Sequence, residues 1–506
     1  MVENEVQGEW TLPDGWVWTT LGNVISIRNG FAFKSRDYQD EGVLLIRQSN
    51  LGEDGIRLAR AVYLPSEYLY KYSDYTVRKG DILIGMSGSV GNTCVYDLDA
   101  PGLQNQRTGL IRFHGETHKL YVRYFLDTLK SQLLSQAKGV AVQNISASEI
   151  QAFSLPLAPL VEQRRIVAEI ETQLTRLDAG VAALERLRTN LKRYRAAVLK
   201  AAYDGRLVPT EAALARAEGR AYEPADQLLA RILAERRARW EVEHPGKQYR
   251  EPAPRNTEGL PELPEGWAWA TLDVCSDLIT KGESPGWQGH KYVEAGVPFV
   301  RSENVLWGSL GFSSLVYVSG EFHRKLSRSQ LQPSDVLINI VGASIGRCAV
   351  VPEDLGQANI NQAVALIRCN VSLLPKYVMY LLISPVFQIT IQGKKVDVAR
   401  ANISLTDLRQ LCVPVAPLAE QHRIIAEVER RLSVVAALER EVEAALARAT
   451  RLRQAILKRA FEGRLVPQDP NDEPAAVLLE RIRAAREAPA TGGKKRRTRQ
   501  MPLPMM

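Results

Sequence analysis

Two long stretches of the chain carry apolar residues at helical spacing. Residues 160–208 and 418–466 contain no proline; each begins after a proline, and the proline that follows it completes the segment Gly-Arg-Leu-Val-Pro. A proline before a helix and a glycine at its end are typical start and stop signals. The apolar steps of three, four and seven form a heptad pattern, which is typical of helices packed side by side. The apolar positions are Val167, Ile170, Leu174, Leu177, Val181, Leu184, Leu191 and Val198, and then Ile425, Val428, Leu432, Val435, Val442, Leu446, Ala449 and Ile456.

This pattern leaves two packing arrangements open. Residues 162–200 alone would form a helix of roughly 58 Å at about 1.5 Å per residue. Such a helix is longer than a globular domain of this size. We therefore favour a pair of long helices over a helix that only covers its own domain. Arg188 and Arg195 interrupt the first apolar seam. Gly180 is expected to weaken the first helix by about 1 kcal/mol relative to alanine.

The stretches that precede these helices have a different pattern of residues. Residues 10–153 and 263–411 mix short β-branched runs with Gly, Asp, Asn and Ser turns. The runs are typical of strands of four to six residues, with short helices between them. We therefore predict an α/β or α+β globule in each stretch. The clearest examples are strands at Asp81–Gly85, Leu110–Phe113 and Val336–Val341 and helices at Tyr121–Gln136 and Pro375–Ile391.

The chain is an internal duplication. LPDGWVWTTL at Leu12–Leu21 returns as LPEGWAWATL at Leu263–Leu272, and LPLAPLVEQRRI at Leu155–Ile166 returns as VPVAPLAEQHRI at Val413–Ile424. The offset between the copies drifts only from 251 to 258 residues. A repeat of this length indicates a duplicated domain pair, because solenoid periods are far shorter. The other shared positions are Arg47/Arg301, Asn50/Asn304, Asp81/Asp335, Ser89/Ser344, Gly91/Gly346, Asn105/Asn361, Gln106/Gln362, Asn144/Asn402 and Gly205/Gly463.

The duplication sets the predicted domain plan. A charged helix at Pro224–Glu243 is followed by a proline-rich stretch, typical of an extended linker, before the second copy begins. A similar Glu-Pro-Ala-x-x-Leu-Leu-x-Arg-Ile segment returns near the C-terminus, at Glu473. The predicted parts are a first globular domain at 1–155, a first long helix at 156–208, a linker at 209–262, a second globular domain at 263–412, a second long helix at 413–466, and a C-terminal helix with a basic tail at 467–506.

Composition and charge narrow the class of protein. The 506 residues are 45% hydrophobic and 24% charged, which is typical of a globular protein. We find neither a run of about 18 apolar residues nor a signal peptide. The five cysteines are scattered and form no C-x-x-C pair, so we expect a reducing cytoplasm and no zinc site. Five charges of the net +8 lie in the C-terminal tail, at Lys494, Lys495, Arg496, Arg497 and Arg499, so charge alone is weak evidence for a polyanionic partner.

Catalytic motifs are scarce. Gly342–Gly346 fits the G-x-S-x-G pattern of serine hydrolases, but its repeat partner lacks the first glycine, and a tight turn is the better interpretation. His114 and His118 have i,i+4 spacing within a glycine-containing turn without a third ligand, which favours surface histidines over a metal site. No phosphate-binding loop or dinucleotide fingerprint is present. We therefore expect no catalytic residues and no metal in this chain.

Polar side chains are abundant in both globular regions. Arg47–Asn50, Gln104–Arg107 and Gln143–Asn144 hold groups that can pair with base edges in the DNA major groove. The alternative is that the Asn and Gln side chains satisfy turn backbones. For the residues that both copies share, we favour the turn role or a phosphate contact.

These motifs together resemble the specificity (S) subunits of type I restriction–modification systems. The resemblance covers essentially the whole chain. It rests on the LPxGW openings at Leu12 and Leu263, the P-L-x-E-Q-x-R-I segments at Pro159 and Pro417, the Gly-Arg-Leu-Val-Pro exits, and the order of the duplicated plan.

The resemblance implies a DNA-recognition subunit that is not itself an enzyme. It implies two target-recognition domains, each reading one half of a bipartite double-stranded DNA site. It also implies two long, antiparallel coiled-coil helices that separate them with pseudo-twofold symmetry. Expected partners are two methyltransferase subunits and two restriction subunits in a bacterial or archaeal cytoplasm. S-adenosylmethionine, ATP and Mg²⁺ are expected on those partners, and no cofactor is expected on this chain.

Specificity is expected where the copies differ, because shared residues cannot encode different half-sites. The divergent segments are 30–39 against 281–292 and 138–143 against 394–401. The predicted DNA-binding residues are Lys34, Arg36, Arg47, Gln48, Arg107, Lys138 and Gln143 in the first copy and Lys281, Gln288, Arg301, Lys394, Lys395 and Arg400 in the second.

Two other functions stay open on the sequence. One is a coiled-coil scaffold that does not read DNA. The other is a serine hydrolase built on Ser344 and assisted by His422.

Overall fold

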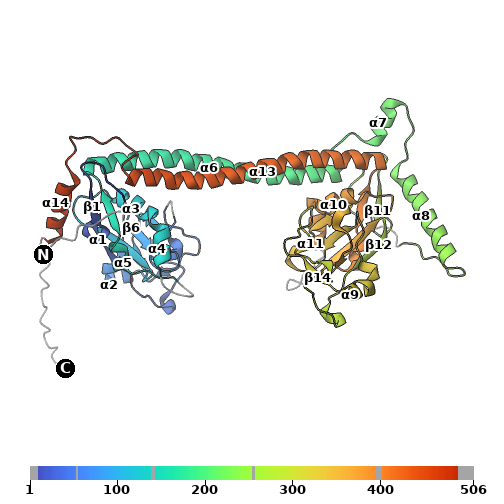
Figure 1. Cartoon of the computed structure of the whole chain (residues 1–506), viewed down its shortest axis with the longest axis horizontal. Coiled ribbons are helices and arrows are strands. Elements are labelled where there is room, and N and C mark those ends of the chain that lie inside the picture. Colours follow the sequence, from blue (N-terminus) through green and yellow to red (C-terminus); the bar gives the residue numbers. More distant parts are fainter. Residues whose placement is uncertain (1–9, 53–54, 138–142, 253–256, 394–401, 488–506) are drawn as a thin grey trace, which may run out of the picture. The chain divides into compact units, whose positions relative to one another are not determined.

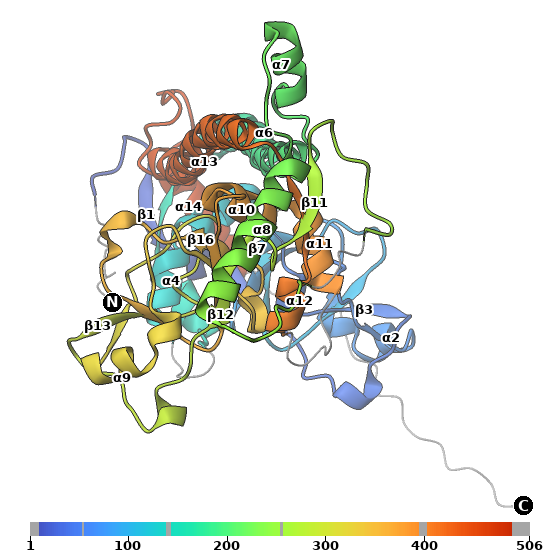
Figure 2. The same ribbon diagram turned by 90° about the vertical axis from the view of Figure 1, so that its right-hand side faces the viewer.

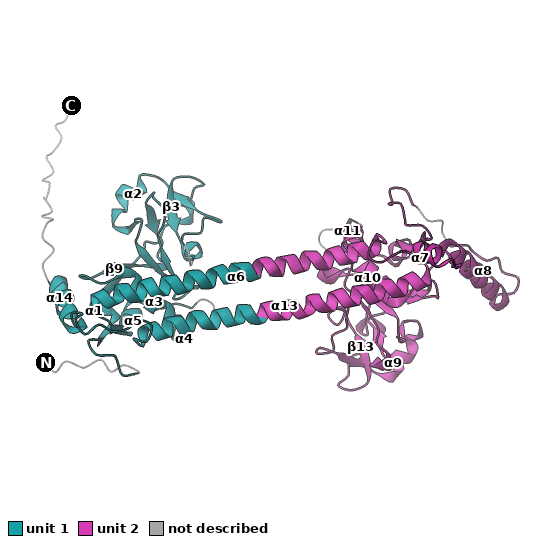
Figure 3. Cartoon of the chain, turned by 90° about the horizontal axis from the view of Figure 1, so that it is seen from above, with its two compact units in different colours: residues 1–184, 444–506 teal, residues 185–443 magenta. Residues whose placement is uncertain are grey.

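The computed structural model divides the chain into two compact units. It describes residues 10–52, 55–137, 143–252, 257–393 and 402–487. Unit 1 comprises residues 1–184 and 444–506, and unit 2 comprises the single stretch 185–443. Both boundaries fall inside a long helix, so α6 (Leu160–Tyr203) and α13 (Leu418–Phe461) each contribute one segment to each unit, as Figure 3 shows.

Unit 1 contains a mixed α/β globule, as predicted (Figure 1). One sheet has the order β2-β9-β6-β7, a second has β4-β3-β8-β5, and β1 pairs antiparallel with β10. The elements are β1 (Val17–Thr20), α1 (Leu21–Val24), β2 (Ile25–Asn29), β3 (Val43–Ile46), β4 (Tyr63–Leu64), α2 (Tyr68–Lys71), β5 (Thr76–Val77), β6 (Ile82–Gly85), β7 (Thr93–Val95), β8 (Gly102–Gln104), β9 (Thr108–Phe113), α3 (Lys119–Thr128), α4 (Lys130–Gln136), α5 (Ala147–Gln151), β10 (Ser154–Leu157) and α14 (Ala475–Glu487).

Unit 2 repeats this topology, except that its second sheet has three strands where that of unit 1 has four. Its sheets have the orders β12-β18-β15-β16 and β14-β13-β17, and β11 pairs antiparallel with β19. Helix α8 runs past β11 (Figure 2) and buries Ala225 and Leu229 in the core of the unit. The elements are α7 (Glu211–Glu218), α8 (Ala225–Glu243), β11 (Ala268–Thr271), β12 (Ser276–Lys281), β13 (Val297–Val300), β14 (Val316–Val318), α9 (Gly320–Lys325), β15 (Val336–Asn339), β16 (Cys348–Val350), β17 (Asn359–Ile360), β18 (Val364–Cys369), α10 (Pro375–Leu382), α11 (Pro385–Gly393), α12 (Leu405–Arg409) and β19 (Cys412–Val415).

The predicted helix pair is present. Within unit 1, Arg453 of α13 pairs with Asp178 of α6, and within unit 2 Arg195 of α6 lies 2.9 Å from Glu439 of α13. The late residues of one helix therefore pack beside the early residues of the other, which is an antiparallel arrangement. Arg188 and Arg195, which interrupt the heptad seam, thus form ion pairs with Glu443 and Glu439 of α13 instead of leaving a gap in it.

The long helices end earlier than predicted, at Tyr203 and Phe461, because of the glycine that follows each of them. Gly205 and Gly463 both have φ of +66°, a left-handed conformation that closes a helix and favours glycine. A Cβ on Gly205 would also lie 2.5 Å from Pro264 Cγ, so the second LPxGW opening packs directly against this turn.

Two short helices predicted as continuous are broken in the structure. The segment at 375–391 splits into α10 and α11 because Pro385 has no backbone N–H with which to continue the helix. The segment at 121–136 splits at Leu129, where the Thr128 hydroxyl donates to the Phe125 carbonyl and competes with the helix ladder. Within the part of the chain that the structure describes, each helix is too short or too polar to span a lipid bilayer.

The LPxGW and P-L-x-E-Q segments are joined in each unit by a buried hydrogen bond. Trp16 Nε1 donates to Glu162 Oε2 at 2.9 Å, and Trp267 Nε1 donates to Glu420 Oε1 at 3.0 Å. Burial raises the pKa of both carboxyl groups above the ordinary value for glutamate. The repeated motifs therefore anchor each globule to the start of a long helix.

Candidate nucleic-acid interface

Three predicted DNA-binding residues of unit 1 meet at the loop that follows β6. Gly88 N donates to Gln143 O at 2.9 Å, and Met86 N donates to Arg107 O at 3.1 Å. Gln48 Nε2 lies 2.6 Å from the place that a Cβ on Gly88 would occupy. Gly88 also has φ of +73°, a left-handed conformation that favours glycine. Both this conformation and the nearby Gln48 side chain therefore favour glycine at position 88. Residues from positions 48, 107 and 143 are thus brought to one loop.

Beside this loop lies a polar hollow of about 330 Å³. Its lining contains one guanidinium group, from Arg107, and no carboxylate. An arginine that is not offset by acidic neighbours suits a base edge or a phosphate. The lining residues are Asn29, Met86, Ser87, Gln106, Arg107, Asn144, Ile145 and Ser146. Sequence reasoning missed Asn29 and Ser87 as candidates, although the second copy differs from the first at Ser87.

Lys34 and Arg36 do not line this hollow. Both are exposed, Lys34 just before and Arg36 within the single 3₁₀ turn Ser35–Asp37. Arg36 Nε lies 3.7 Å from the Asp37 carboxylate, an exposed pair that is worth at most about 1 kcal/mol. Their role in DNA binding stays a prediction.

Asparagine and arginine side chains that both copies share form hydrogen bonds with the backbone of their own loops. Asn50 accepts from Arg47 N at 3.0 Å and donates to Arg57 O at 2.8 Å, and Asn304 makes the matching bonds in unit 2. The turn role that we favoured for shared asparagines is confirmed at these two positions. Arg47 and Arg301 also donate to backbone carbonyls, at 2.6 and 3.2 Å, and their contact with DNA stays a prediction.

The remaining predicted residues of unit 2 are partly described. Lys281 is exposed at the end of β12, and Gln288 lies in the 3₁₀ turn Gly286–Gln288, where it donates to Glu283. Lys138, Lys394, Lys395 and Arg400 lie outside the described residues.

Within the described residues, the features that raised the hydrolase and metal alternatives do not assemble into a site. Ser344 Oγ accepts from Asn339 Nδ2 at 3.1 Å, and within the described residues no hydrogen bond joins Ser344 to His422. Burial lowers the pKa of His114 and His118 below the ordinary histidine value. Among the described residues, no group of three or more His, Cys, Asp and Glu side chains could hold a metal ion.

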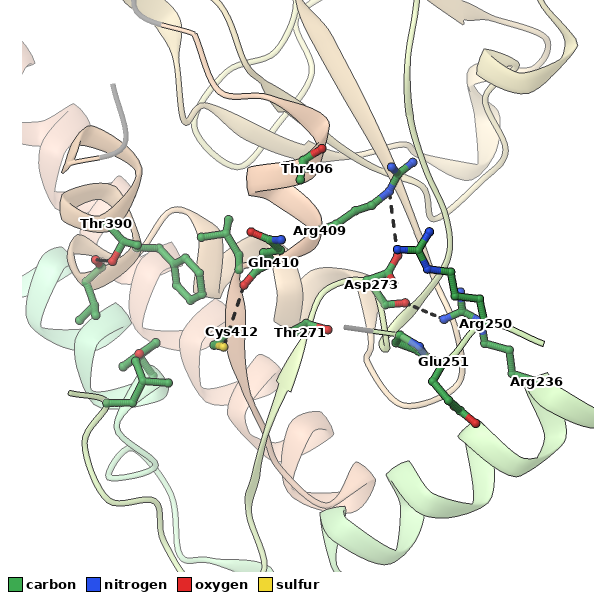
Figure 4. Close-up of a pocket in the computed structure, with 16 residues that line it drawn as sticks. Arg236, Arg250, Glu251, Thr271, Asp273, Thr390, Thr406, Arg409, Gln410 and Cys412 are labelled. Atoms are coloured by element: carbon green, nitrogen blue, oxygen red, sulfur yellow. Dashed lines mark hydrogen bonds and ion pairs between the residues drawn. The ribbon is translucent and has the colours of Figure 1, made fainter. Parts of the chain in front are cut away.

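A larger cavity of about 880 Å³ lies in unit 2, where the linker meets the globule (Figure 4). Arg236 donates to Asp273 O at 2.9 Å, and Arg409 donates to Ile279 O at 2.8 Å and lies 3.9 Å from the Asp273 carboxylate. Arg236 thus holds the linker helix α8 against the turn between β11 and β12, and Arg409 holds α12 against β12. None of the predicted DNA-binding residues lines this cavity.

Comparisons with known proteins agree with this arrangement. Residues 13–191 match the family model described as the type I restriction modification DNA specificity domain. The chain is 29% identical to the EcoBI specificity subunit of Escherichia coli, over 98% of this chain and 97% of that protein. It is 26% identical to the EcoKI specificity subunit of Escherichia coli strain K12, over 96% and 98% of the two chains.

A solved structure has the same fold. It comes from work on complex assembly and conformational transition of the type I R-M system, and it superposes with a TM-score of 0.64 at 21% identity. The superposition covers 90% of this chain and 100% of that chain. Relatives that match across nearly their whole length, together with the duplicated plan, lead to one conclusion: the chain is similar, over nearly its whole length, to the specificity subunits of type I restriction–modification systems.

Proposed function

We propose that this chain is the DNA sequence-specificity subunit of a type I restriction–modification complex. Each globule reads one half of a bipartite double-stranded site, and the chain docks methyltransferase and restriction subunits. It contributes recognition and no catalysis, as the names of its relatives indicate. The observation that carries the proposal is the carboxylate-free polar hollow in a chain that matches specificity subunits from end to end.

The proposed DNA contacts fall into two groups. Gln48, Arg107 and Gln143 meet at the loop after β6, and Arg107 also lines the hollow; we propose that these three residues reach base edges. The others are proposed to hold the phosphate backbone or to extend the reading surface, and they are Lys34, Arg36, Arg47, Lys138, Lys281, Gln288, Arg301, Lys394, Lys395 and Arg400.

The partners are DNA and the other subunits of a restriction–modification complex. We further propose two methyltransferase and two restriction subunits. Tyr194 and Leu452 occupy the same place in the repeat, one in each unit, and they are 46% and 52% exposed. These matching positions are where we propose that one partner subunit docks on each unit. S-adenosylmethionine, ATP and Mg²⁺ would then be held by those partners, in the cytoplasm of a bacterium or archaeon.

Methylation mapping of host DNA tests the proposal. Deleting the gene for this chain should abolish methylation at one bipartite motif while the methyltransferase is still expressed. Restoring the gene should bring back the same motif. A host in which no methylated motif depends on the gene would refute DNA reading and favour the scaffold function.

Salt dependence gives a second test on the purified complex. The logarithm of the binding constant should fall by about 0.9 per phosphate contact for each tenfold rise in salt. A binding constant that does not change with salt would rule out the proposed phosphate contacts.

A further inference from the structure

The two units hold the same backbone frame around the hollow. In each unit, matching hydrogen bonds hold three backbone segments in place. The segments are the end of β2 or β12, the loop after β6 or β15, and the turn before β9 or β18. The bonds are Met86 N to Arg107 O at 3.1 Å and Ile340 N to Ala363 O at 2.9 Å, Ile145 N to Met86 O at 3.0 Å and Ile403 N to Ile340 O at 2.9 Å, and Gly30 N to Thr108 O at 3.3 Å and Gly282 N to Val364 O at 3.4 Å.

Further contacts fix the register of this frame. Ser87 bridges to Asn144, and Val341 bridges to Asn402, in the same antiparallel sense. A Cβ on Gly30 would overlap the carbonyls of Asn105 and Gln104, and one on Gly282 would overlap the carbonyl of Ile360, the counterpart of Gln104. The backbone that surrounds the hollow is therefore shared, and it cannot by itself distinguish two half-sites.

The side chains that the frame presents do differ. At the strand end Asn29 is replaced by Lys281, and at the turn Arg107 is replaced by Ala363. On the bridge Val341 takes the place of Ser87 in space, although the repeated letters align Ser87 with Gly342. By contrast, the neighbouring Gln106/Gln362 and Asn144/Asn402 are the same in both units. The first unit thus presents polar groups where the second presents a lysine and two apolar groups.

From this difference we infer the kind of base edge that each unit reads, an inference that rests on the proposed function. Unit 1 reads a guanine through Arg107, and unit 2 reads the methyl group of a thymine through Val341 and Ala363. The three exchanged positions set the half-site, and the shared frame sets the position of the DNA strand against each unit.

The chemistry of Arg107 carries the first half of the inference. Its side chain is exposed, and within the described residues its guanidinium group forms no recorded hydrogen bond or ion pair. Only its backbone is used, since its N–H lies 3.4 Å from Asn105 Oδ1 and its carbonyl accepts from Met86. A guanidinium fork held by a fixed backbone pairs bidentately with O6 and N7 of guanine, the commonest specific contact of arginine with DNA.

The apolar pair carries the second half. Val341 is 36% exposed, and Ala363 is partly exposed at the matching turn. Neither side chain can donate or accept a hydrogen bond. The thymine C5-methyl group is the feature of the major groove that apolar side chains recognise.

Methylation mapping of Arg107 variants tests the guanine contact in the native host. R107A should relax one guanine of the first half-site, roughly tenfold to a hundredfold in methylation rate relative to the other bases. R107K keeps the positive charge but not the bidentate fork, so it should relax the same position. K79A is the control variant. Lys79 is exposed, pairs with Asp99 and does not line the hollow, so its loss should leave the motif unchanged.

Base substitution tests the thymine contact on the purified complex. Replacing each thymine of the second half-site by deoxyuridine removes only its methyl group. One position should lose roughly fourfold in affinity, the value of one buried methyl group. The double variant V341S/A363S should lose this sensitivity, while the deoxyuridine series over the first half-site serves as the control.

The outcomes separate this inference from the proposed function. If R107A lowers the methylation rate of the bipartite motif uniformly, with no change in base preference, then Arg107 is a phosphate contact. This outcome would overturn the guanine assignment alone. Equal affinity for all deoxyuridine substitutions would overturn the thymine assignment alone. If the wild-type host has no methylated bipartite motif that depends on this chain, DNA reading by the chain is itself refuted.

Discussion

The two buried anchors of the molecule share a centre and differ at the periphery. In unit 1, Glu162 accepts from Trp16 and from the side chain of Gln468, at 2.9 and 3.2 Å. In unit 2, Glu420 accepts from Trp267 at 3.0 Å and from the backbone N–H of Glu211 at 2.8 Å. The tryptophan–glutamate pair was thus kept through duplication, whereas the second donor was exchanged.

This exchange changes how replaceable the second donor is. Gln468 Nε2 also donates to Gly463 O at 2.5 Å, so its amide keeps a partner if Glu162 is lost. The Glu211 N–H is a helix-start donor inside a buried site, and no other acceptor is recorded for it among the described residues. A buried donor without an acceptor costs about 1–3 kcal/mol, so the anchor of unit 2 should be the less tolerant of the two.

The largest expected effect is on stability. E420A should lower the free energy of unfolding by about 3 kcal/mol, and E162A by about 2 kcal/mol, because the first change strands two donors and the second strands one. Urea unfolding followed by circular dichroism measures both. E480A on the exposed face of α14 is the matched control and should change stability by less than about 0.5 kcal/mol. Equal losses for E162A and E420A would show that the exchanged donor is irrelevant.

Two carboxyl groups near these anchors should respond to protonation in opposite ways. Burial raises the pKa of Glu162. Burial alone would also raise the pKa of Glu211, but the hydrogen bonds from Arg220 and Arg423 lower it below the ordinary value for glutamate. The two carboxyl groups should therefore make opposite contributions to the pH dependence of folding.

The sign follows from proton binding. Above the unfolded pKa of about 4.3, the native state holds the Glu162 proton longer than the unfolded state, so this group's contribution to stability falls as pH rises through that window. The Glu211 contribution is instead present above about pH 4.3 and is lost as pH falls through the lowered folded pKa. Relative to E162Q and E211Q, the wild type should thus show stability differences of opposite slope, each at most about 1.4 kcal/mol per pH unit. Urea midpoints measured between pH 3 and pH 7 check this, and slopes of the same sign would contradict it.

These anchors also mark the limit of what the sequence could predict. The long helices, the duplication and the α/β texture were predictable because apolar spacing and repeated letters are local signals. The partners of Glu162 and Glu420 were not, since Gln468 lies 306 residues from Glu162 and nothing local links them. Helix α7 was also missed, although the Thr210 side chain caps it by accepting from Ala213 N and Gly219 ends it at φ +66°.

The candidate interface was predictable only in part. Gln48, Arg107 and Gln143 were chosen by residue type, and the fold brings them together because residues 88 and 86 hydrogen-bond to the loops that carry two of them. Asn29 escaped notice because a single asparagine at a strand end has no distinctive spacing. Its place beside the hollow depends on strand pairing between β2 and β9, which one sequence does not reveal.

A smaller effect is expected from the helix that carries a glycine. Gly180 is exposed within α6, and a Cβ added there would meet nothing within 4 Å. Its counterpart in the repeat is Leu438, which has no such cost in backbone entropy. G180A should therefore stabilise unit 1 by about 1 kcal/mol, while L438A should leave unit 2 within about 0.5 kcal/mol. Thermal unfolding of the two variants compares them, and destabilisation by G180A would reveal a contact that needs the glycine.

The smallest expected effect concerns the ion pairs between the helices. In unit 2, Arg195 lies 2.9 Å from Glu439, and both side chains are about one-third exposed. An ion pair that remains in contact with solvent is screened and is worth about 0.2–1 kcal/mol. A double-mutant cycle with R195A and E439A should give a coupling energy near 0.5 kcal/mol that shrinks at high salt, because the Debye length falls to about 3 Å at 1 M salt. A coupling above about 2 kcal/mol, independent of salt, would mean that this pair defines the register of the helices and does not merely fill an interruption in their apolar seam.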